Sequence, residues 1–140
     1  MLFRSDLPQL ALYDRPLTGM ERPAILAHLA ARQPGLAWIA ENEAGKIAGF
    51  VLAREGRVAT SIGPVVADDE TIALSLIAKA VSATPGPFIM DIPQVHRKLQ
   101  AWLEAQNAVS PRGYMRMTLG EAKGLDDPTH LFALAGPELG

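Results

Sequence analysis

The sequence predicts an α+β domain with a mixed, mainly antiparallel twisted sheet and helices on both faces. Three observations lead to this class: apolar residues at helical spacing in the first third, strand-like runs joined by short loops in the middle, and alternating helix and strand patterns afterwards. The 140 residues are 49% hydrophobic, which suffices for one buried core and excludes a disordered or collagen-like chain. We therefore expect one domain over residues 1–140.

The first third is expected to form two short helices. Ser5 is the predicted N-cap of the first, which should end in a turn at residues 15–19. The second should begin near Pro23, since proline suits a first helical turn, and should end before Pro34 and Gly35.

The middle of the chain changes to a strand-like pattern. Residues 36–41, 46–54 and 57–66 are apolar runs separated by loops short enough for hairpins, which predicts an antiparallel meander. Asp68 and Asp69 then precede a helical pattern, which they are expected to cap, and the breaker at residues 84–87 should end it.

The last third is expected to alternate strand and helix. A short strand is expected at residues 88–92, followed by Pro93 and a helix. This helix should end at Asn107 as a left-handed C-cap. The apolar side chains that it should turn inward are Val95, Leu99, Trp102 and Leu103. Further strands are expected at residues 113–119 and 130–135. This order after a meander predicts the mixed sheet.

Composition narrows the possible partners. The formal charge is −2 and no basic stripe is present, so nucleic acid is not an expected partner. No apolar run is long enough to cross a bilayer, so we expect no membrane partner and a cytoplasmic protein. The chain has no Cys, which excludes disulfides and thiolate nucleophiles, and its three His are too scattered to predict a metal site.

Several strings in this order point to a known family: GKIAGFVLAR, IGPVVADD, MDIP, YMRM and AGPELG, at residues 45–54, 62–69, 90–93, 114–117 and 135–140. With them the chain resembles the GNAT acyltransferase superfamily over nearly its whole length, and most of all the C-terminal half of two-domain GNAT-like proteins. The resemblance implies an N-acetyltransferase that uses acetyl-CoA to acylate an amine of a small molecule or a peptide. We also expect a homodimer, because this architecture leaves sheet edges that need covering, or pairing with a second GNAT-like domain.

The resemblance places a cofactor site where two neighbouring strands splay apart. Gly63 and Pro64 lie at that position, and a Gly-Pro pair suits a locally broken strand edge, because Pro lacks an N–H and Gly tolerates unusual φ. An ordinary bulge with no ligand is the other interpretation. The implied cofactor contacts are the backbone of Gly63, Val65 and Val66 for pantetheine, and the amides of the following helix for pyrophosphate, at Thr71, Ile72 and Ala73.

This sequence departs from the family at the pyrophosphate loop. Residues 66–73 contain neither the expected glycines nor an arginine, and three carboxylates stand there instead, on Asp68, Asp69 and Glu70. Two like unit charges about 4 Å apart repel by roughly 1 kcal/mol in water and about 4 at an effective dielectric near 20. An alternative therefore stays open: a non-catalytic GNAT-like ligand-binding or dimerisation module that has lost the pyrophosphate loop, with an unoccupied or closed strand gap.

The catalytic candidates are Asp91, His96 and Tyr114. Leu103 stands where the family commonly has its general acid, a Tyr. Asp91 interrupts an apolar strand. It is either a structural Asp that accepts bonds from backbone N–H groups or from Arg116 or Arg54, or a base or amine anchor. His96 either reaches a cleft or is a solvated first-turn residue, and Tyr114 could line the same cleft as Asp91. The implied reaction is direct acyl transfer to an amine after deprotonation by a cleft base or water.

Overall fold

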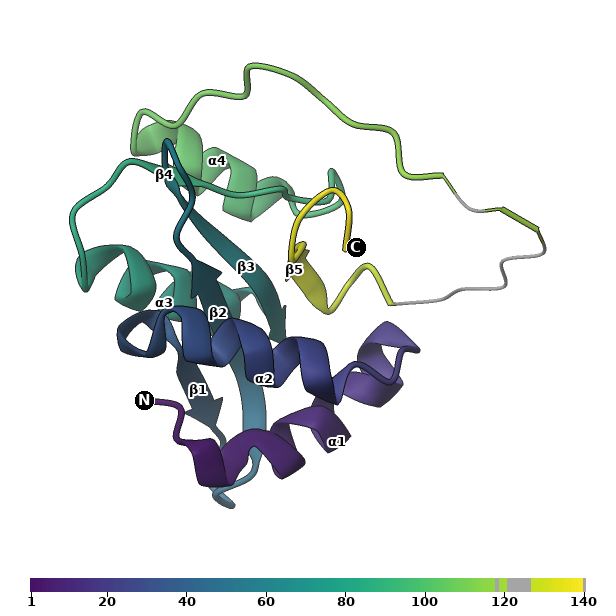
Figure 1. Cartoon of the computed structure of the whole chain (residues 1–140). Coiled ribbons are helices and arrows are strands. Elements are labelled where there is room, and N and C mark those ends of the chain that lie inside the picture. The colour runs from purple at the N-terminus through teal and green to yellow at the C-terminus, as the bar shows by residue number, and fades with distance from the viewer. Residues whose placement is uncertain (118, 121–126, 140) are drawn as a thin grey trace.

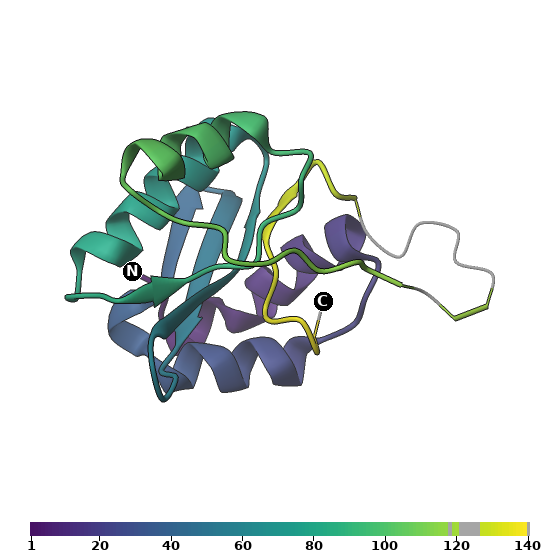
Figure 2. The ribbon, with the colours of Figure 1, turned by 90° about the horizontal axis from the view of Figure 1, so that it is seen from above.

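Two helices cover each face of the sheet. The computed structural model describes residues 1–117, 119–120 and 127–139. Helices α1 (Leu7–Thr18) and α2 (Pro23–Arg32) lie on one face, and α3 (Glu70–Ser82) and α4 (Arg97–Ala105) on the other, as the two views in Figures 1 and 2 agree. The predicted α+β class with helices on both faces is confirmed. In the described part of the chain, no helix combines the length and apolar character that crossing a bilayer requires.

The start of α1 differs from the prediction. Ser5 does not cap the helix: a short 3-10 turn at Arg4–Asp6 precedes it, and the Asp6 carboxylate accepts a hydrogen bond from the Phe3 N–H at 2.7 Å. The turn expected at residues 15–19 is also wrong, because α1 continues through Pro16 and ends at Gly19, which has φ 68°. Pro16 removes one helical hydrogen bond, and only the left-handed Gly19 ends the helix.

The predicted meander is confirmed in the sheet. Strands β1 (Trp38–Glu41), β2 (Ile47–Arg54) and β3 (Thr60–Ala67) pair antiparallel in chain order. A second 3-10 turn, Pro34–Leu36, precedes β1. Helix α3 follows the meander along the chain, and β4 (Phe88–Ile89), which comes after α3, runs parallel to β3. The last strand, β5 (Leu131–Ala133), also pairs with β3, in the antiparallel direction.

One edge of β3 therefore has two partners. Its first residues lie beside β4, with Thr60 opposite Phe88, and its last residues lie beside β5, with Val65 opposite Ala133. The other edge of β3 is paired with β2. β3 is thus the central strand of the sheet. Its partner changes between Ser61 and Val65, where the family resemblance places the cofactor site.

Two expectations about the last third are wrong. Residues 113–117 form no strand, and Tyr114, Met115 and Met117 are exposed; Thr118 lies outside the described residues. Both 113–119 and 130–135 carry strand-like patterns, and the later segment is the one that pairs with β3. Val95 is exposed rather than packed inward, because α4 begins only at Arg97, whereas Leu99 is fully buried. The left-handed conformation predicted for Asn107 is confirmed by its φ of 63°, but the C-cap residue of α4 is Gln106, one position earlier.

The core has two parts, one on each face of the sheet. Successive residues of a strand point to opposite faces, so β2, β3 and β5 each contribute to both. Val51, Val65 and Phe132 pack toward α3 and α4. Phe50, Val66 and Leu131 pack toward α1 and α2. β5 is therefore short but belongs to both parts of the core.

Candidate functional site

The strands β3 and β4 diverge after a short stretch of parallel pairing. Their last paired residues are Ser61 and Ile89, and residues 130–134 lie between the separating chains (Figure 2). On one side the Ala67 N–H donates to the His130 carbonyl at 3.0 Å, and on the other the Leu134 N–H donates to the Asp91 carbonyl at 2.9 Å. The divergence is the splay that the resemblance predicted, and the chain itself bridges it.

Gly63 stands where β5 comes closest to β3. Its φ is 151°, and a Cβ added there would lie 2.0 Å from the Leu134 carbonyl oxygen. Only glycine fits such an approach. The peptide bond between Gly63 and Pro64 is cis. The presence of Gly at this position is thus explained by the passage of residue 134, without a bound cofactor.

The other predicted pantetheine contacts lie along the same edge. Val65 and Val66 are fully buried, and both are paired with β5 on that edge. A strand edge that is already paired has no free backbone N–H or C=O groups to offer a ligand. In this arrangement β5 stands where the pantetheine arm is predicted to bind.

The helix end predicted to hold pyrophosphate is also engaged. Asp69 is the N-cap of α3, as predicted, and its carboxylate accepts from the Ile72 N–H at 2.9 Å, while its carbonyl accepts from the Ala73 N–H at 3.1 Å. Thr71 is exposed in the first turn, and its carbonyl accepts from the Ser75 hydroxyl. Two of the three predicted amide donors therefore already have acceptors within the helix.

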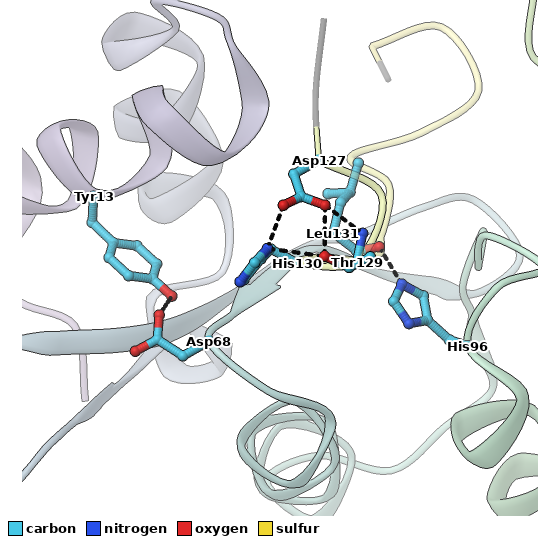
Figure 3. A network of polar contacts seen from close by, with 7 residues as sticks. All are labelled: Tyr13, Asp68, His96, Asp127, Thr129, His130 and Leu131. Atoms are coloured by element: carbon cyan, nitrogen blue, oxygen red, sulfur yellow. Dashed lines mark hydrogen bonds and ion pairs between the residues drawn. The ribbon is translucent and has the colours of Figure 1, made fainter. Parts of the chain in front are cut away.

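The remaining two acids of this turn connect α3 to other helices. The Glu70 carboxylate accepts from the Leu99 N–H in the first turn of α4, at 2.8 Å. The Asp68 carboxylate accepts from the Tyr13 hydroxyl on α1, at 2.8 Å (Figure 3). Burial raises the pKa of Tyr13 above its ordinary value, and the hydrogen bond to Asp68 raises it further. These carboxylates hold the helices around the sheet.

Asp91 follows β4 and is half-buried. Its backbone carbonyl binds Leu134, but its carboxylate makes no hydrogen bond or ion pair within the described ranges. Arg54, one of the partners expected for it, instead pairs with Glu138, with 3.0 Å between Nη2 and Oε1. Asp91 is therefore a carboxylate at the strand divergence that stays available for a ligand.

His96 is buried, with 6% of its surface exposed, so the expectation of a solvated first-turn residue is wrong. Since a carbonyl can only accept, the imidazole Nε2–H donates to the Leu131 carbonyl at 2.7 Å, as Figure 3 shows. The ring also lies on Phe132, with 4.1 Å between ring centroids. Packing of β5 against α4 is what buries this side chain, and the sequence around His96 carries no sign of it.

Tyr114 lies on the exposed segment after α4. Its side chain is 57% exposed, and the Arg112 guanidinium stands 5.0 Å from its ring centroid. Within the described residues it contacts neither Asp91 nor His96. The structure thus brings Asp91 and His96 to opposite ends of the β5 segment, through Leu134 and Leu131, and does not add Tyr114 to them.

The side-chain hydrogen bonds of the polar turn that leads into β5 were not predicted from the sequence. The Asp127 carboxylate accepts from the Thr129 hydroxyl at 2.6 Å, from the Thr129 N–H at 2.9 Å and from His130 Nδ1 at 2.8 Å (Figure 3). The Thr129 hydroxyl, the Thr129 N–H and His130 lower the pKa of Asp127 to about 2. The signal in the sequence is an Asp two residues before a Thr and ahead of an apolar run, which favours a side-chain-capped turn.

In this arrangement the site does not fit acetyl-CoA. β5 occupies the strand edge, Gly63 faces the Leu134 carbonyl, and acids surround the start of α3. Among the predicted site residues, only Asp91 has a half-buried polar side chain that makes no hydrogen bond or ion pair with another described residue.

One comparison with known proteins bears on these observations. The sequence model of the family described as "Acetyltransferase (GNAT) domain" matches residues 10–133, which is most of the chain and includes every helix and strand from α2 to β5. No curated protein matches the sequence.

Proposed function

We propose that this chain, which belongs to the GNAT acetyltransferase domain family, acts as an N-acetyltransferase that uses acetyl-CoA to acylate an amine of a small molecule or a peptide. The observation that supports this best is the divergence of β3 and β4 after Ser61 and Ile89. Where parallel strands separate, an extended segment can pair with the strand edge, as an added strand does, and residues 130–134 do so here. The present occupant of the gap is a segment of the same chain, so the gap is large enough for an extended backbone.

Within this proposal, Asp91 binds the acceptor amine. Its carboxylate is half-buried at the carboxyl end of β4 and is not engaged by other described residues. A carboxylate in such surroundings can hold an ammonium group and accept a proton from it. His96 is less suited while β5 is in place, because its Nε2–H is used on Leu131.

Two measurements test the activity. The first is thermal melting with acetyl-CoA or CoA, where a ligand at ten times its Kd adds about 1.4 kcal/mol to the free energy of unfolding. The second is amine-dependent release of free CoA thiol, read with a thiol reagent; the chain contains no Cys, so it contributes no signal. We expect a higher melting temperature at millimolar acetyl-CoA, and thiol release with some amines.

Asp91→Asn separates binding of acetyl-CoA from use of the amine. This variant should keep the melting shift and lose at least about tenfold in thiol release, since the amide cannot accept the proton. An unchanged melting temperature at millimolar acetyl-CoA, together with no thiol release from any amine, contradicts the proposal.

A second candidate is a non-catalytic GNAT-like module that pairs with a second copy or with another GNAT-like domain. It is favoured by the closed state of the gap, where Val65 and Val66 pair with β5, and by the engaged amides at the start of α3. The molar mass in solution and the effect of acetyl-CoA distinguish the two candidates. A dimer that acetyl-CoA does not stabilise supports the module, whereas a monomer stabilised by acetyl-CoA contradicts it.

A further inference from the structure

We propose that the acceptor is a small amino acid, whose carboxylate binds the Arg54 guanidinium while its ammonium group binds the Asp91 carboxylate. This inference rests on the proposed function, because it names the substrate class of the same site. It is carried by the position of two opposite charges on one face of the sheet, beside the divergence of β3 and β4. A ligand with one positive and one negative end matches both.

The alternation of side chains directs Arg54 and Asp91 to the same face. Leu52 packs toward α1 and α2, and Arg54 follows it two residues later in β2. Met90 and Ile92 pack toward α3 and α4. Asp91 stands between them on a stretch that pairs with the next segment through its carbonyl, so its side chain is directed to the opposite face, as that of Arg54 is.

The C-terminal residues connect the two charged groups. The Leu134 N–H donates to the Asp91 carbonyl at 2.9 Å, and a Cβ added at Gly136 would lie 2.8 Å from Arg54 Nη2. Leu134 and Gly136 are two residues apart, a separation that a chain spans with at most about 7 Å. The guanidinium and the carboxylate are therefore close enough for one small molecule to contact both.

Arg54 has donors left for a carboxylate. A guanidinium carries five N–H groups in a planar arrangement that suits two parallel hydrogen bonds to a carboxylate. Among the described residues, the acceptor of Arg54 is Glu138 Oε1, 3.0 Å from Nη2, and the buried Nε–H has none. The carboxylate of Glu138 thus occupies the position that the proposal gives to the carboxylate of the ligand.

A ligand can replace Glu138 without any change in the sheet. The Glu138 side chain is 56% exposed and that of Arg54 is 33% exposed, and exposed ion pairs contribute little to stability. The turn that carries Glu138 is also held by its backbone, since the Leu139 N–H donates to the Gly136 carbonyl at 3.1 Å. Rotation of the Glu138 side chain is therefore enough to free the guanidinium.

Asp91 supplies the charge for the ammonium group. Its side chain is half-buried and makes no hydrogen bond or ion pair with another described residue. Partial burial strengthens the attraction between this carboxylate and a cation. Ile89, two residues earlier on the same face, is 53% exposed and offers an apolar contact to the carbon atoms between the two ends of the ligand.

A ligand series tests the proposal without acetyl-CoA. Calorimetry on the wild-type protein compares glycine, β-alanine, γ-aminobutyrate and δ-aminovalerate with the amine and the carboxylic acid of the same chain length. We expect one amino acid to bind about tenfold more tightly than either matched compound, because only the amino acid engages both charges. NMR shifts at the Leu134 and Gly136 amides should accompany binding. Equal affinity of every amino acid and its matched amine overturns the proposal.

Two variants assign the carboxylate to Arg54. Arg54→Gln should bind the amino acid no better than the matched amine, whereas Arg57→Gln, at an exposed arginine of the β2–β3 loop, should keep the wild-type difference. Glu138→Gln removes the competing carboxylate and should tighten amino acid binding by about threefold or more. An unchanged preference in Arg54→Gln overturns the assignment. If Arg54→Gln does not fold, an unchanged affinity in Glu138→Gln overturns it.

The outcomes separate this inference from the proposed function. Release of CoA thiol that is as fast with amines lacking a carboxylate as with amino acids overturns the inference, while the acetyltransferase proposal stands. Tight binding of an amino acid that depends on Arg54, with no thiol release from any amine, overturns the acetyltransferase proposal and leaves an amino acid site. Arg54-dependent binding together with faster thiol release from amino acids supports both.

Discussion

The two ends of the chain are held in the fold by different kinds of contact. α1 is joined to the start of α2 by a buried ion pair, in which Arg22 Nε and Nη2 donate to the Asp14 carboxylate at 2.8 and 2.9 Å. Both side chains are almost fully buried, and Thr18 beside them is fully buried. β5 is attached by backbone pairing to β3, by the buried side chains of Leu131 and Phe132, by His96 and by a polar turn at the surface.

The difference is in what can replace each contact. A buried carboxylate that loses its cation cannot be satisfied by water, so the link between α1 and α2 is permanent in the folded protein. The backbone groups of β3 that hold β5 can pair equally well with another extended chain or ligand. The first attachment thus depends on one specific pair of side chains, and the second includes backbone contacts that another extended segment could also make.

Loss of the buried ion pair should have the largest effect. Asp14→Ala leaves the Arg22 guanidinium buried and unpaired, and should lower the free energy of unfolding by about 3–5 kcal/mol. Urea unfolding measures this. Glu21→Gln is the matched control, because its pair with Arg15 is exposed and should contribute less than about 1 kcal/mol. A loss below about 1 kcal/mol for Asp14→Ala would show that water reaches the pair.

Gly63→Ala should disturb the second attachment. The new Cβ would meet the Leu134 carbonyl and would hold Ala at a φ of 151°, so we expect a loss of about 1–3 kcal/mol in urea unfolding. Hydrogen exchange at the Ala67 amide should also increase, since β5 must shift. Gly35→Ala is the control, because nothing lies within 4 Å of a Cβ there. Unchanged exchange at Ala67 would contradict the close approach of residue 134.

Tyr13 joins α1 to the turn before α3 and should contribute less. Tyr13→Phe removes the hydrogen bond to Asp68 and should cost about 1 kcal/mol at neutral pH. Because the pKa of Tyr13 is raised in the folded state, the unfolded chain loses this proton first, near pH 10, and the stabilisation declines above that pH. Urea unfolding between pH 8 and 11, in wild type and variant, measures the difference. A constant difference across this range would contradict the raised pKa.

The smallest effect is expected at the turn before β5. Asp127 has its pKa lowered to about 2, so its ionised form favours the folded turn above about pH 4, and this contribution is lost as the pH falls through about 2. An NMR titration of the Thr129 amide should follow this ionisation in wild type. In Asp127→Asn the titration should be absent. A midpoint near 4 in wild type would contradict the hydrogen bonds to the carboxylate.

Much of the fold could be predicted, because most of its helices and strands are indicated by patterns among residues near each other in the sequence. The meander of β1 to β3 follows from apolar runs separated by short loops, and the cap of α3 by Asp69 follows from its place before a helical pattern. The strand expected at residues 113–119 was wrong. A strand-like pattern indicates that a segment can pair in a sheet, but it does not show that a strand edge is available to pair with it.

The candidate site was predicted less completely. Gly63 and Val65 lie at the strand divergence, where the resemblance placed them, and Asp91, chosen because it interrupts an apolar strand, follows β4 beside it. The burial of His96 depends on a segment 35 residues further along the chain, so no local pattern could indicate it. The turn at Asp127 has a recognisable local signal, but its role in leading β5 to β3 depends on that same long-range pairing.

What the sequence determined by itself is most of the elements and the family, because helix caps, turns and apolar periodicity act between near neighbours. Only the tertiary structure decided which segment lies beside the second half of β3. Residues 113–119 also carry a strand-like pattern, and the segment that pairs with β3 is the one whose side chains fill both parts of the core, as Leu131 and Phe132 do.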